Sequence, residues 1–143
     1  MTIAAIIGRK GSDTIAVAPD TPLGTVVALL AEHRIGAVPV VDGGAVHGIF
    51  SERDVIRLLA KGDAAQLLGI TVGELMTREP LTVTRDDSVL AALSLMTHRR
   101  IRHLPVVEHG VLIGIVSIGD LVKYRIDRIE ADASAMRDYI QQA

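Results

Sequence analysis

The fold is decided by two stretches of sequence that resemble each other, RIGAVPVVDGGAVHGIFSERD at residues 34–54 and RIRHLPVVEHGVLIGIVSIGD at residues 100–120. They belong to a longer repeat: residues 14–59 align without a gap with residues 80–125, and 13 of the 46 aligned pairs are identical. This self-similarity indicates two copies of one structural unit. The matched pairs include Arg34/Arg100, Ile35/Ile101, Pro39/Pro105, Gly44/Gly110, Gly48/Gly114, Ser51/Ser117 and Asp54/Asp120.

Each copy predicts the same order of elements, βαββα. A short β-rich segment, at 15–17 and again at 81–83, precedes a helix with apolar residues at helical spacing. Two apolar runs follow, and in the first copy they are joined by the sequence 42–44, whose glycines permit the positive φ angles of a tight hairpin. A final helix begins at Ser51 in the first copy and at Ser117 in the second.

The predicted fold class is α/β (α+β): two tandem βαββα repeats related by pseudo-twofold symmetry, with the sheets packed together and the helices outside. We expect a first repeat with an N-terminal helical segment at residues 1–66, a second repeat at 67–128 and an amphipathic helical tail at 129–143. The tail carries an apolar stripe that needs a partner surface, on this module or on another chain. The stripe consists of Ile129, Ala133, Met136 and Ile140.

Composition argues against several classes of function. The formal net charge is −2 and the chain has three aromatic residues, so it offers neither a basic field nor a stacking platform for nucleic acid. It contains no cysteine, which excludes disulfides and thiol chemistry and agrees with a reducing compartment. Its apolar runs are too short for a signal peptide or a membrane span. We expect a cytoplasmic protein.

The sequence resembles a known family, the tandem cystathionine-β-synthase-type (CBS) domain pair, or Bateman module. The resemblance is carried by residues 35–41 and 48–54, by residues 100–107 and 114–120, and by residues 72–76 between the copies. It implies two repeats packed sheet to sheet, with two clefts for a regulatory adenine nucleotide (AMP, ADP, ATP or NAD). It also implies a flat homodimer. The resemblance to stand-alone pairs points to AMP- or NAD-type ligands. Because the sequence encodes no output domain, we expect the effector to be a separate protein.

Ser51 and Asp54, like Ser117 and Asp120, stand three residues apart at a predicted helix start. One interpretation is a capping box, in which serine and carboxylate satisfy backbone amides. The other is a ribose contact, because a carboxylate can accept charge-assisted hydrogen bonds from two hydroxyls while the helix start favours a phosphate. The two roles are compatible, and the resemblance favours a ribose contact in at least one copy.

The segments that lead into the two hairpins, 36–39 and 102–105, have two interpretations. They are strand entries in which proline fixes φ, or, as the resemblance implies, they lie along the adenine ring. Cations cluster in the second copy at Arg99, Arg100, Arg102 and His103. We expect Arg102 and a neighbour to contact phosphate, although such clusters usually form a solvated face and Arg102 could instead occlude the cleft.

The complete set of predicted ligand-binding residues adds positions on both sides of these motifs. Arg53 is a phosphate or partner contact, while Lys10 and Gly11 are more typical of a surface turn than of an anion contact. The set is Thr14, Ile15, Gly36, Ala37, Val38, Pro39, Ser51, Arg53, Asp54, Pro80, Leu81, Arg100, Arg102, His103, Leu104, Pro105, Ser117 and Asp120.

We expect neither a metal site nor catalysis. The five histidines lack the spacing of metal ligands and are interpreted as surface residues, and no nucleophile has an evident orienting partner. The leading hypothesis is a regulatory module in which nucleotide occupancy alters the packing of the repeats or of two modules. The alternative is a ligand-free interaction scaffold on the same fold, with helix caps instead of a ligand site.

Overall fold

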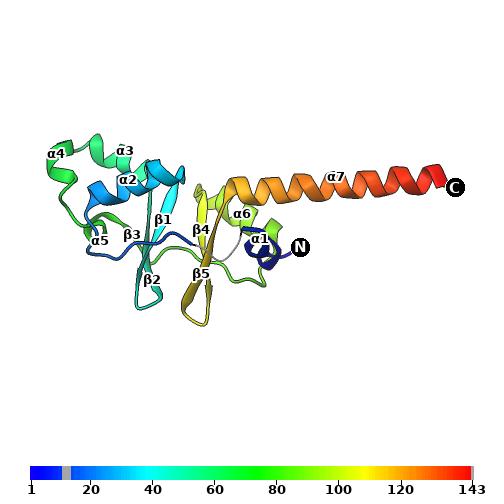
Figure 1. Cartoon of the computed structure of the whole chain (residues 1–143), viewed down its shortest axis with the longest axis horizontal. Helices are drawn as coiled ribbons and strands as arrows, with labels where there is room; N and C mark the ends of the chain where they lie inside the picture. The colour runs from blue at the N-terminus through cyan, green and yellow to red at the C-terminus, as the bar shows by residue number, and fades with distance from the viewer. Residues whose placement is uncertain (11–13, 143) are drawn as a thin grey trace.

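The computed structural model describes residues 1–10 and 14–142 and places two β-hairpins side by side, each with its own helices (Figure 1). In chain order the elements are α1 (Ile3–Lys10), α2 (Leu23–His33), β1 (Ala37–Asp42), β2 (Ala45–Ser51), α3 (Glu52–Leu59), α4 (Ala64–Leu67), α5 (Val72–Leu75), β3 (Thr77–Arg78), α6 (Val89–Arg99), β4 (His103–Glu108), β5 (Val111–Ser117) and α7 (Ile118–Gln142). The antiparallel pairs β1–β2 and β4–β5 form the hairpins, and β3 adds to the edge of β2. The predicted mixed α/β fold of two tandem repeats is confirmed.

The two hairpins have the same internal geometry. In the first, the strand register shifts between Val40 and Val41, and in the second it shifts 66 residues later, between Val106 and Val107. Positive φ angles close both turns, at Gly43 and Gly44 in the first and at the sequence 109–110 in the second. This geometry suits the right-handed twist of the flanking strands, so the predicted tight hairpins are confirmed.

The first β segment of each repeat is shorter than predicted. Val17 and Val83 each form a single parallel bridge, to Val40 and Val106 respectively. Beyond the bridge the chain turns away from the hairpin, because the Pro19 carbonyl accepts from the Gly73 amide of α5 at 2.9 Å. The Arg85 carbonyl accepts from the Ala4 amide of α1 at the same distance. These backbone groups therefore hold neighbouring helices instead of extending a strand.

Each repeat encloses its own apolar core between its hairpin and its helices. The core of repeat one is built from Val17, Leu23, Val26, Leu30, Val38, Val40, Phe50 and Val72. The core of repeat two is built from Ile3, Ile6, Val83, Val89, Ala92, Met96, Leu104, Val106, Val116 and Leu121. Helices α2 and α6 each present one apolar face to this interior. Strands β1 and β4 bury a continuous run of side chains, whereas β2 and β5 bury alternate residues toward their ends.

Helix α1 packs into repeat two, although it precedes repeat one in the chain. Ile3 and Ile6 are buried in the second core, while Val72 of α5 takes the equivalent place in the first. The backbone hydrogen bonds correspond as well. The Val72 amide donates to the Thr21 carbonyl at 2.8 Å, and the Ile3 amide donates to the Asp87 carbonyl, at the position equivalent to Thr21, at 2.9 Å. Repeat two is thus completed by α1, which precedes repeat one, and repeat one is completed by α5, which lies between the two repeats. The exact domain limits stay a prediction.

Two equivalent glycines mark where these completing helices approach the hairpins. A Cβ at Gly48 would collide with Met76 and lie 2.7 Å from the Thr77 carbonyl oxygen. For a Cβ at Gly114 the three nearest atoms all belong to the Ile7 side chain, whose flexible end can move. We therefore expect Gly48→Ala to lower the free energy of unfolding by about 1–3 kcal/mol, because a backbone atom must move. Gly114→Ala is the matched control, and urea unfolding that gave equal losses for both variants would contradict this.

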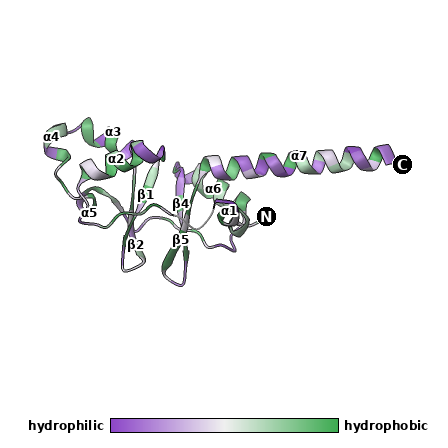
Figure 2. Cartoon of the chain, viewed as in Figure 1, coloured by the Kyte–Doolittle hydropathy of each residue, from purple (hydrophilic) through white to green (hydrophobic). Residues whose placement is uncertain are grey.

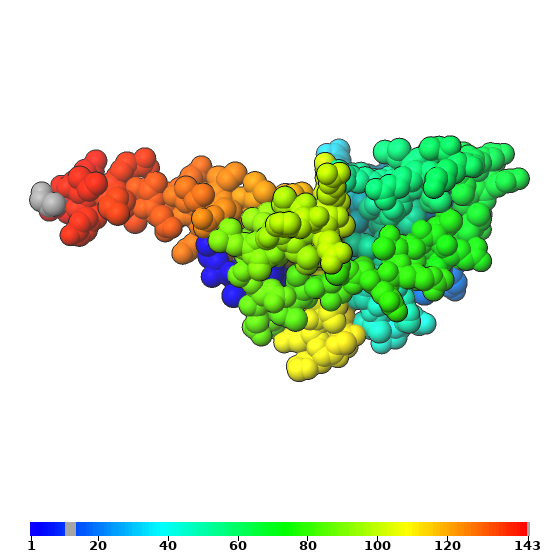
Figure 3. Space-filling model, turned by 180° about the vertical axis from the view of Figure 1, so that it is seen from behind, coloured from blue at the N-terminus to red at the C-terminus, as the bar shows by residue number. Residues whose placement is uncertain are grey.

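The last helix is continuous. The predicted final helix of repeat two and the predicted helical tail form a single element, α7, which extends well beyond the body of the molecule (Figure 3). Within residues 1–10 and 14–142, no helix combines the length and the apolarity that crossing a membrane requires.

Candidate functional site

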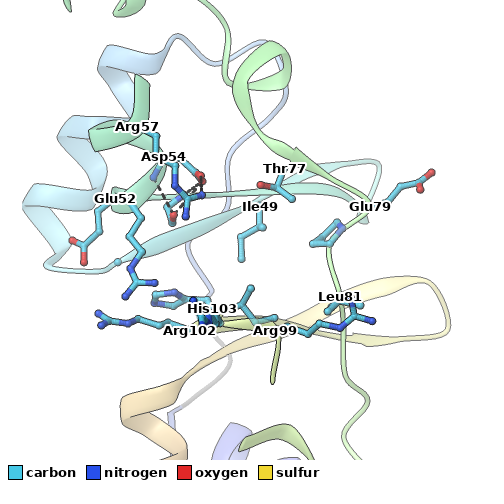
Figure 4. Close-up of a pocket in the computed structure, with 16 residues that line it drawn as sticks. Ile49, Glu52, Asp54, Arg57, Thr77, Glu79, Leu81, Arg99, Arg102 and His103 are labelled. Atoms are coloured by element: carbon cyan, nitrogen blue, oxygen red, sulfur yellow. Dashed lines mark hydrogen bonds and ion pairs between the residues drawn. The ribbon is translucent and has the colours of Figure 1, made fainter. Parts of the chain in front are cut away.

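A cleft of about 480 Å³, here called cleft 1, lies between the two repeats. One wall is α3, with Asp54 in its first turn and Arg57 one turn later, and the opposite wall is the start of β4, with His103 and the preceding Arg102 (Figure 4). The Ile49 side chain points into the space between them. Cleft 1 is lined by Gly36, Ile49, Ser51, Glu52, Arg53, Asp54, Arg57, Thr77, Glu79, Pro80, Leu81, Arg99, Arg100, Ile101, Arg102 and His103.

A second cleft of about 360 Å³, cleft 2, is built largely from the equivalent positions 66 residues away. Here the start of α7 replaces the start of α3, and the segment before β1 replaces the segment before β4. Cleft 2 is lined by Ile7, Lys10, Thr14, Ile15, Arg34, Ile35, Gly36, Ala37, His103, Gly114, Ile115, Ser117 and Asp120. Each cleft therefore takes its walls from both repeats, so the packing of the repeats determines its shape.

The carboxylate of cleft 1 is held by the capping box that the sequence predicts. Asp54 Oδ2 accepts from the Ser51 amide at 2.9 Å and from Ser51 Oγ at 3.1 Å, and the Asp54 amide donates back to Ser51 Oγ. Arg57 Nη1 lies 3.7 Å from Asp54 Oδ1, and the Arg57 side chain is 73 % exposed. The capping interactions use Oδ2, which leaves Oδ1 with only a long, solvent-screened ion pair.

The carboxylate of cleft 2 carries the same cap and a strong additional partner. Asp120 Oδ2 accepts from the Ser117 amide at 2.8 Å and from Lys10 Nζ at 2.7 Å. Burial tends to raise the pKa of Asp120, but the hydrogen bonds from Lys10 and Ser117 outweigh it and hold the pKa below its ordinary value of 3.8. Lys10, the last residue of α1, thus crosses cleft 2 and is not part of a surface turn; Gly11 lies outside the described residues.

This difference gives a pH-dependent prediction. Because folding lowers the pKa of Asp120, its charge contributes stability that is fully present above pH 3.8 and is lost as the pH falls through the folded-state value. We expect Asp120→Asn to cost at most about 1 kcal/mol at pH 7, since solvent screens the ion pair, and to cost progressively less as the pH falls below 3.8. Urea unfolding of both proteins across this pH range measures this. A cost that does not change with pH would contradict it.

His103 separates the two clefts and is half-buried, unlike the surface histidine that the sequence predicts. Its ring lies against the backbone of Gly36, where an added Cβ would come within 3.0 Å of it. Burial lowers the pKa of His103, and Lys10 and Arg102 lower it further, whereas Glu52 and Asp120 oppose them. The neutral imidazole is therefore favoured, which avoids an unpaired buried charge.

The cationic cluster of the second copy lines cleft 1. One wall carries Arg99, Arg100 and Arg102, and the opposite wall carries Arg53 and Arg57. The lining of cleft 1 therefore contains five guanidinium groups and three carboxylates, those of Glu52, Asp54 and Glu79. These arginines are exposed, as expected for a solvated face, but they also surround one cavity. Among the residues that the structure describes, the lining of cleft 2 has two cationic side chains, Lys10 and Arg34, and Lys10 is paired with Asp120.

The structure brings most of the predicted site residues to one of the two clefts. Four lie elsewhere, because Val38 and Leu104 are buried in the two cores and the prolines that follow them are buried as well. The Pro39 and Pro105 carbonyls accept from the Val17 and Val83 amides, so these backbone groups are already used. Cleft 1 contains Gly36, Ser51, Arg53, Asp54, Pro80, Leu81, Arg100, Arg102 and His103, and cleft 2 contains Thr14, Ile15, Gly36, Ala37, His103, Ser117 and Asp120.

Several lining residues escaped the sequence reasoning. Ile49 and Ile101 form apolar parts of cleft 1, and both belong to identical pairs of the repeat, which is a signal that could have identified them. Arg57 lies one helical turn after Asp54, so helical spacing alone would have placed it beside the carboxylate. Lys10 is a weak sequence candidate for an anion contact, but no local signal predicts that it pairs with Asp120, because the two residues lie 110 positions apart in the sequence.

The geometry defines a tandem-repeat module with two clefts between its repeats, and comparison with known proteins identifies its family. The family model of the CBS domain matches residues 10–61 and 72–127. The chain therefore belongs to the CBS-domain family, as the sequence predicts. Among the residues that the structure describes, no group of three or more histidine, aspartate or glutamate side chains is arranged to hold a metal ion.

Individual relatives match over most of the chain. The mitochondrial CBS domain-containing protein CBSX3 of Arabidopsis thaliana is 34 % identical and covers 98 % of this chain and 72 % of its own. The CBS-domain protein ATU1752 of Agrobacterium tumefaciens has a structure with a TM-score of 0.81 and 40 % identity, covering 87 % of this chain and 99 % of its own. The crystal structure of CBSX2 in complex with AMP is similar with a TM-score of 0.77 and 26 % identity, covering 88 % of this chain and 97 % of its own.

Proposed function

We propose that this chain is a regulatory module that binds an adenine nucleotide in cleft 1. The observation that carries the proposal is the placement of a capped, 17 % exposed carboxylate, Asp54, across a 480 Å³ cleft from a cluster of arginines. A cavity of this size is typical of small-molecule sites. The AMP complex of CBSX2, a structural relative, supports the same class of ligand.

Each part of a nucleotide has a suitable partner in cleft 1. Asp54 Oδ1 is available to accept hydrogen bonds from the ribose hydroxyls, while the cap holds the side chain in place. Ile49 and Leu81 offer apolar surface to the base. Arg102 and the other arginines suit the phosphate, since a guanidinium can donate two parallel hydrogen bonds to it. The excess of cations favours a phosphorylated ligand over the free nucleoside.

Cleft 2 is the weaker site in this proposal. A ligand that uses Asp120 has to replace or share Lys10, which already donates to the same carboxylate at 2.7 Å. The cost of separating this partly buried pair lowers the affinity for a second nucleotide. The alternative function, a ligand-free scaffold, finds its support here, because in cleft 2 the serine and aspartate cap α7 and hold α1 without a ligand.

Regulation follows from the position of cleft 1 between the repeats. A ligand that contacts both walls favours the arrangement in which those walls lie at the right separation, provided that its affinity differs between arrangements. A separate effector protein would detect this change. The homodimer, the effector and the cytoplasmic location remain proposals; one relative is mitochondrial by its name.

Calorimetric titration tests the proposal with AMP, ATP and NAD as ligands, and with adenosine and CMP as matched controls that lack the phosphate or the purine. We expect binding of at least one adenine nucleotide in the micromolar range and much weaker binding of both controls. Binding of CMP as tightly as AMP would point to phosphate recognition alone. Absence of heat and of any thermal shift with all three nucleotides would favour the scaffold.

A further inference from the structure

The outer part of α7 carries large apolar side chains that are exposed among residues 1–10 and 14–142. Ile129 is 53 % exposed, Met136 is 59 % exposed and Ile140 is 63 % exposed. Figure 2 shows apolar and polar residues alternating along this helix where it extends away from the body. The family model ends at residue 127, so the exposed segment lies outside the CBS match.

The apolar positions of α7 follow the spacing of a coiled coil. They succeed one another at intervals of four, three, four, three and four residues, which is the alternation of a and d positions in a heptad repeat. The seam is about 27 Å long at 1.5 Å per residue. It consists of Val122, Ile126, Ile129, Ala133, Met136 and Ile140.

The body of the molecule covers a different side of α7. Leu121 is buried in the core of repeat two, and Arg9 of α1 lies over the Tyr124 ring at 5.3 Å and pairs with Asp127 at 3.6 Å. Val122 and Ile126, which begin the seam, remain 42 % and 49 % exposed. At 100° per residue the seam faces about a quarter turn away from Leu121, so it is accessible along its whole length.

We propose that α7 forms a parallel, in-register, two-stranded coiled coil with α7 of a second copy of this chain. In this orientation each g position faces the e position of the next heptad on the other helix. With Ile126 at a, Arg125 at g faces Glu130 of the second copy, and Asp132 at g faces Arg137 of the second copy. All of these pairs are opposite in charge, and each occurs twice.

An antiparallel pair of the same helices is disfavoured by the same residues. In an antiparallel pair, e positions face e positions and g positions face g positions. Asp132 then lies opposite Asp132 of the second copy, and Lys123 lies near Arg137 of the second copy. These contacts join like charges. The charge pattern therefore specifies one orientation as well as the partner.

A membrane surface suits α7 less well than a second copy. Helices that lie on anionic membranes carry a basic polar face. Between residues 123 and 138, α7 has four basic and four acidic side chains, so it has no net positive charge to attract such a surface.

Disulfide formation tests the proposal directly, because the chain contains no cysteine of its own. In a parallel in-register pair, single cysteines at a or d positions of the two helices come close enough to bridge. We expect Ile140→Cys and Met136→Cys to form covalent dimers rapidly under mild oxidation. Ser134→Cys, on the outer side of α7, should react only slowly. If the two seam variants react no faster than Ser134→Cys, the proposal is wrong, whatever other dimer forms.

Charge exchange tests the orientation and the pairing. Combined with Ile140→Cys, either Asp132→Arg or Arg137→Asp places like charges across the seam, so each variant alone should cross-link less than Ile140→Cys. Mixed after reduction, the two variants restore both attractive pairs, and the heterodimer should dominate the oxidised product, as resolved by mass. A statistical mixture of homodimers and heterodimer would overturn the assigned pairing.

Two aspartates in the seam provide a further check. Ile129→Asp with Met136→Asp should abolish cross-linking through Cys at position 140, because unpaired carboxylates then replace the apolar contacts. Ala131→Asp with Ala135→Asp adds the same charge on the outer side and should leave cross-linking unchanged. Equal loss in both double variants would attribute the effect to net charge and contradict the proposed seam.

Discussion

Asp54→Ala is expected to weaken the binding of AMP to cleft 1 by about a hundredfold, or roughly 3 kcal/mol. The substitution removes the carboxylate that would accept hydrogen bonds from two ribose hydroxyls. Inside a cleft, water replaces such charge-assisted bonds only in part. Calorimetric titration of both proteins under identical conditions gives the ratio of the dissociation constants.

The control for this experiment has to separate binding from helix capping, because Asp54 also caps α3. Asp120→Ala removes the equivalent cap from α7 and should leave the affinity of cleft 1 unchanged. Thermal unfolding of each variant reports the capping cost, which is about 1 kcal/mol for such positions. If both substitutions weakened AMP binding equally, a general loss of stability would explain the result, and Asp54 would have no specific role.

Phe50→Ala is expected to reduce the free energy of unfolding by about 3–5 kcal/mol. Among the described residues, Phe50 is the largest side chain that is fully buried. It lies in the core of repeat one and is paired with Val38 in the register of the hairpin. Its removal leaves a cavity that the surrounding helices and strands fill only in part. Because domains are stable by only about 5–15 kcal/mol, the variant loses a large share of its stability.

Two substitutions calibrate this expectation under urea. Phe50→Leu keeps most of the apolar volume and should cost clearly less than Phe50→Ala. Val116→Ala, at the equivalent position of repeat two, removes a smaller side chain and should also cost less. A loss below about 1 kcal/mol for Phe50→Ala would mean that the core of repeat one collapses around the cavity, contrary to the close packing inferred here.

Phe50 also links the core to the site, because Ser51 and the first turn of α3 follow it directly. The position of Asp54 depends on that helix start, so Phe50→Ala should weaken nucleotide binding more than its remaining folded fraction explains. Phe50→Leu, which keeps the hairpin packed, should not.

Much of the architecture was predictable from local signals that occur twice. Glycines at the hairpin turns, Ser51 and Ser117 before the helices, and the period of the apolar residues all act within a few positions of sequence. Such short-range constraints define the same elements in each copy, and the repeat made each interpretation independently testable. The serine and aspartate pairs line the two clefts, one pair at the start of α3 and the other at the start of α7.

Other features were decided by packing between distant segments. Which core α1 completes, the pairing of Lys10 with Asp120 and the burial of His103 against Gly36 all join residues that lie far apart in the sequence. No local pattern encodes them, because they depend on which apolar surface remains open once both hairpins have formed. The sequence alone therefore determined two equivalent repeats and placed the arginine cluster in the second of them. The tertiary structure decided that this cluster lines cleft 1 and that Lys10 occupies cleft 2, because both outcomes depend on contacts between distant segments.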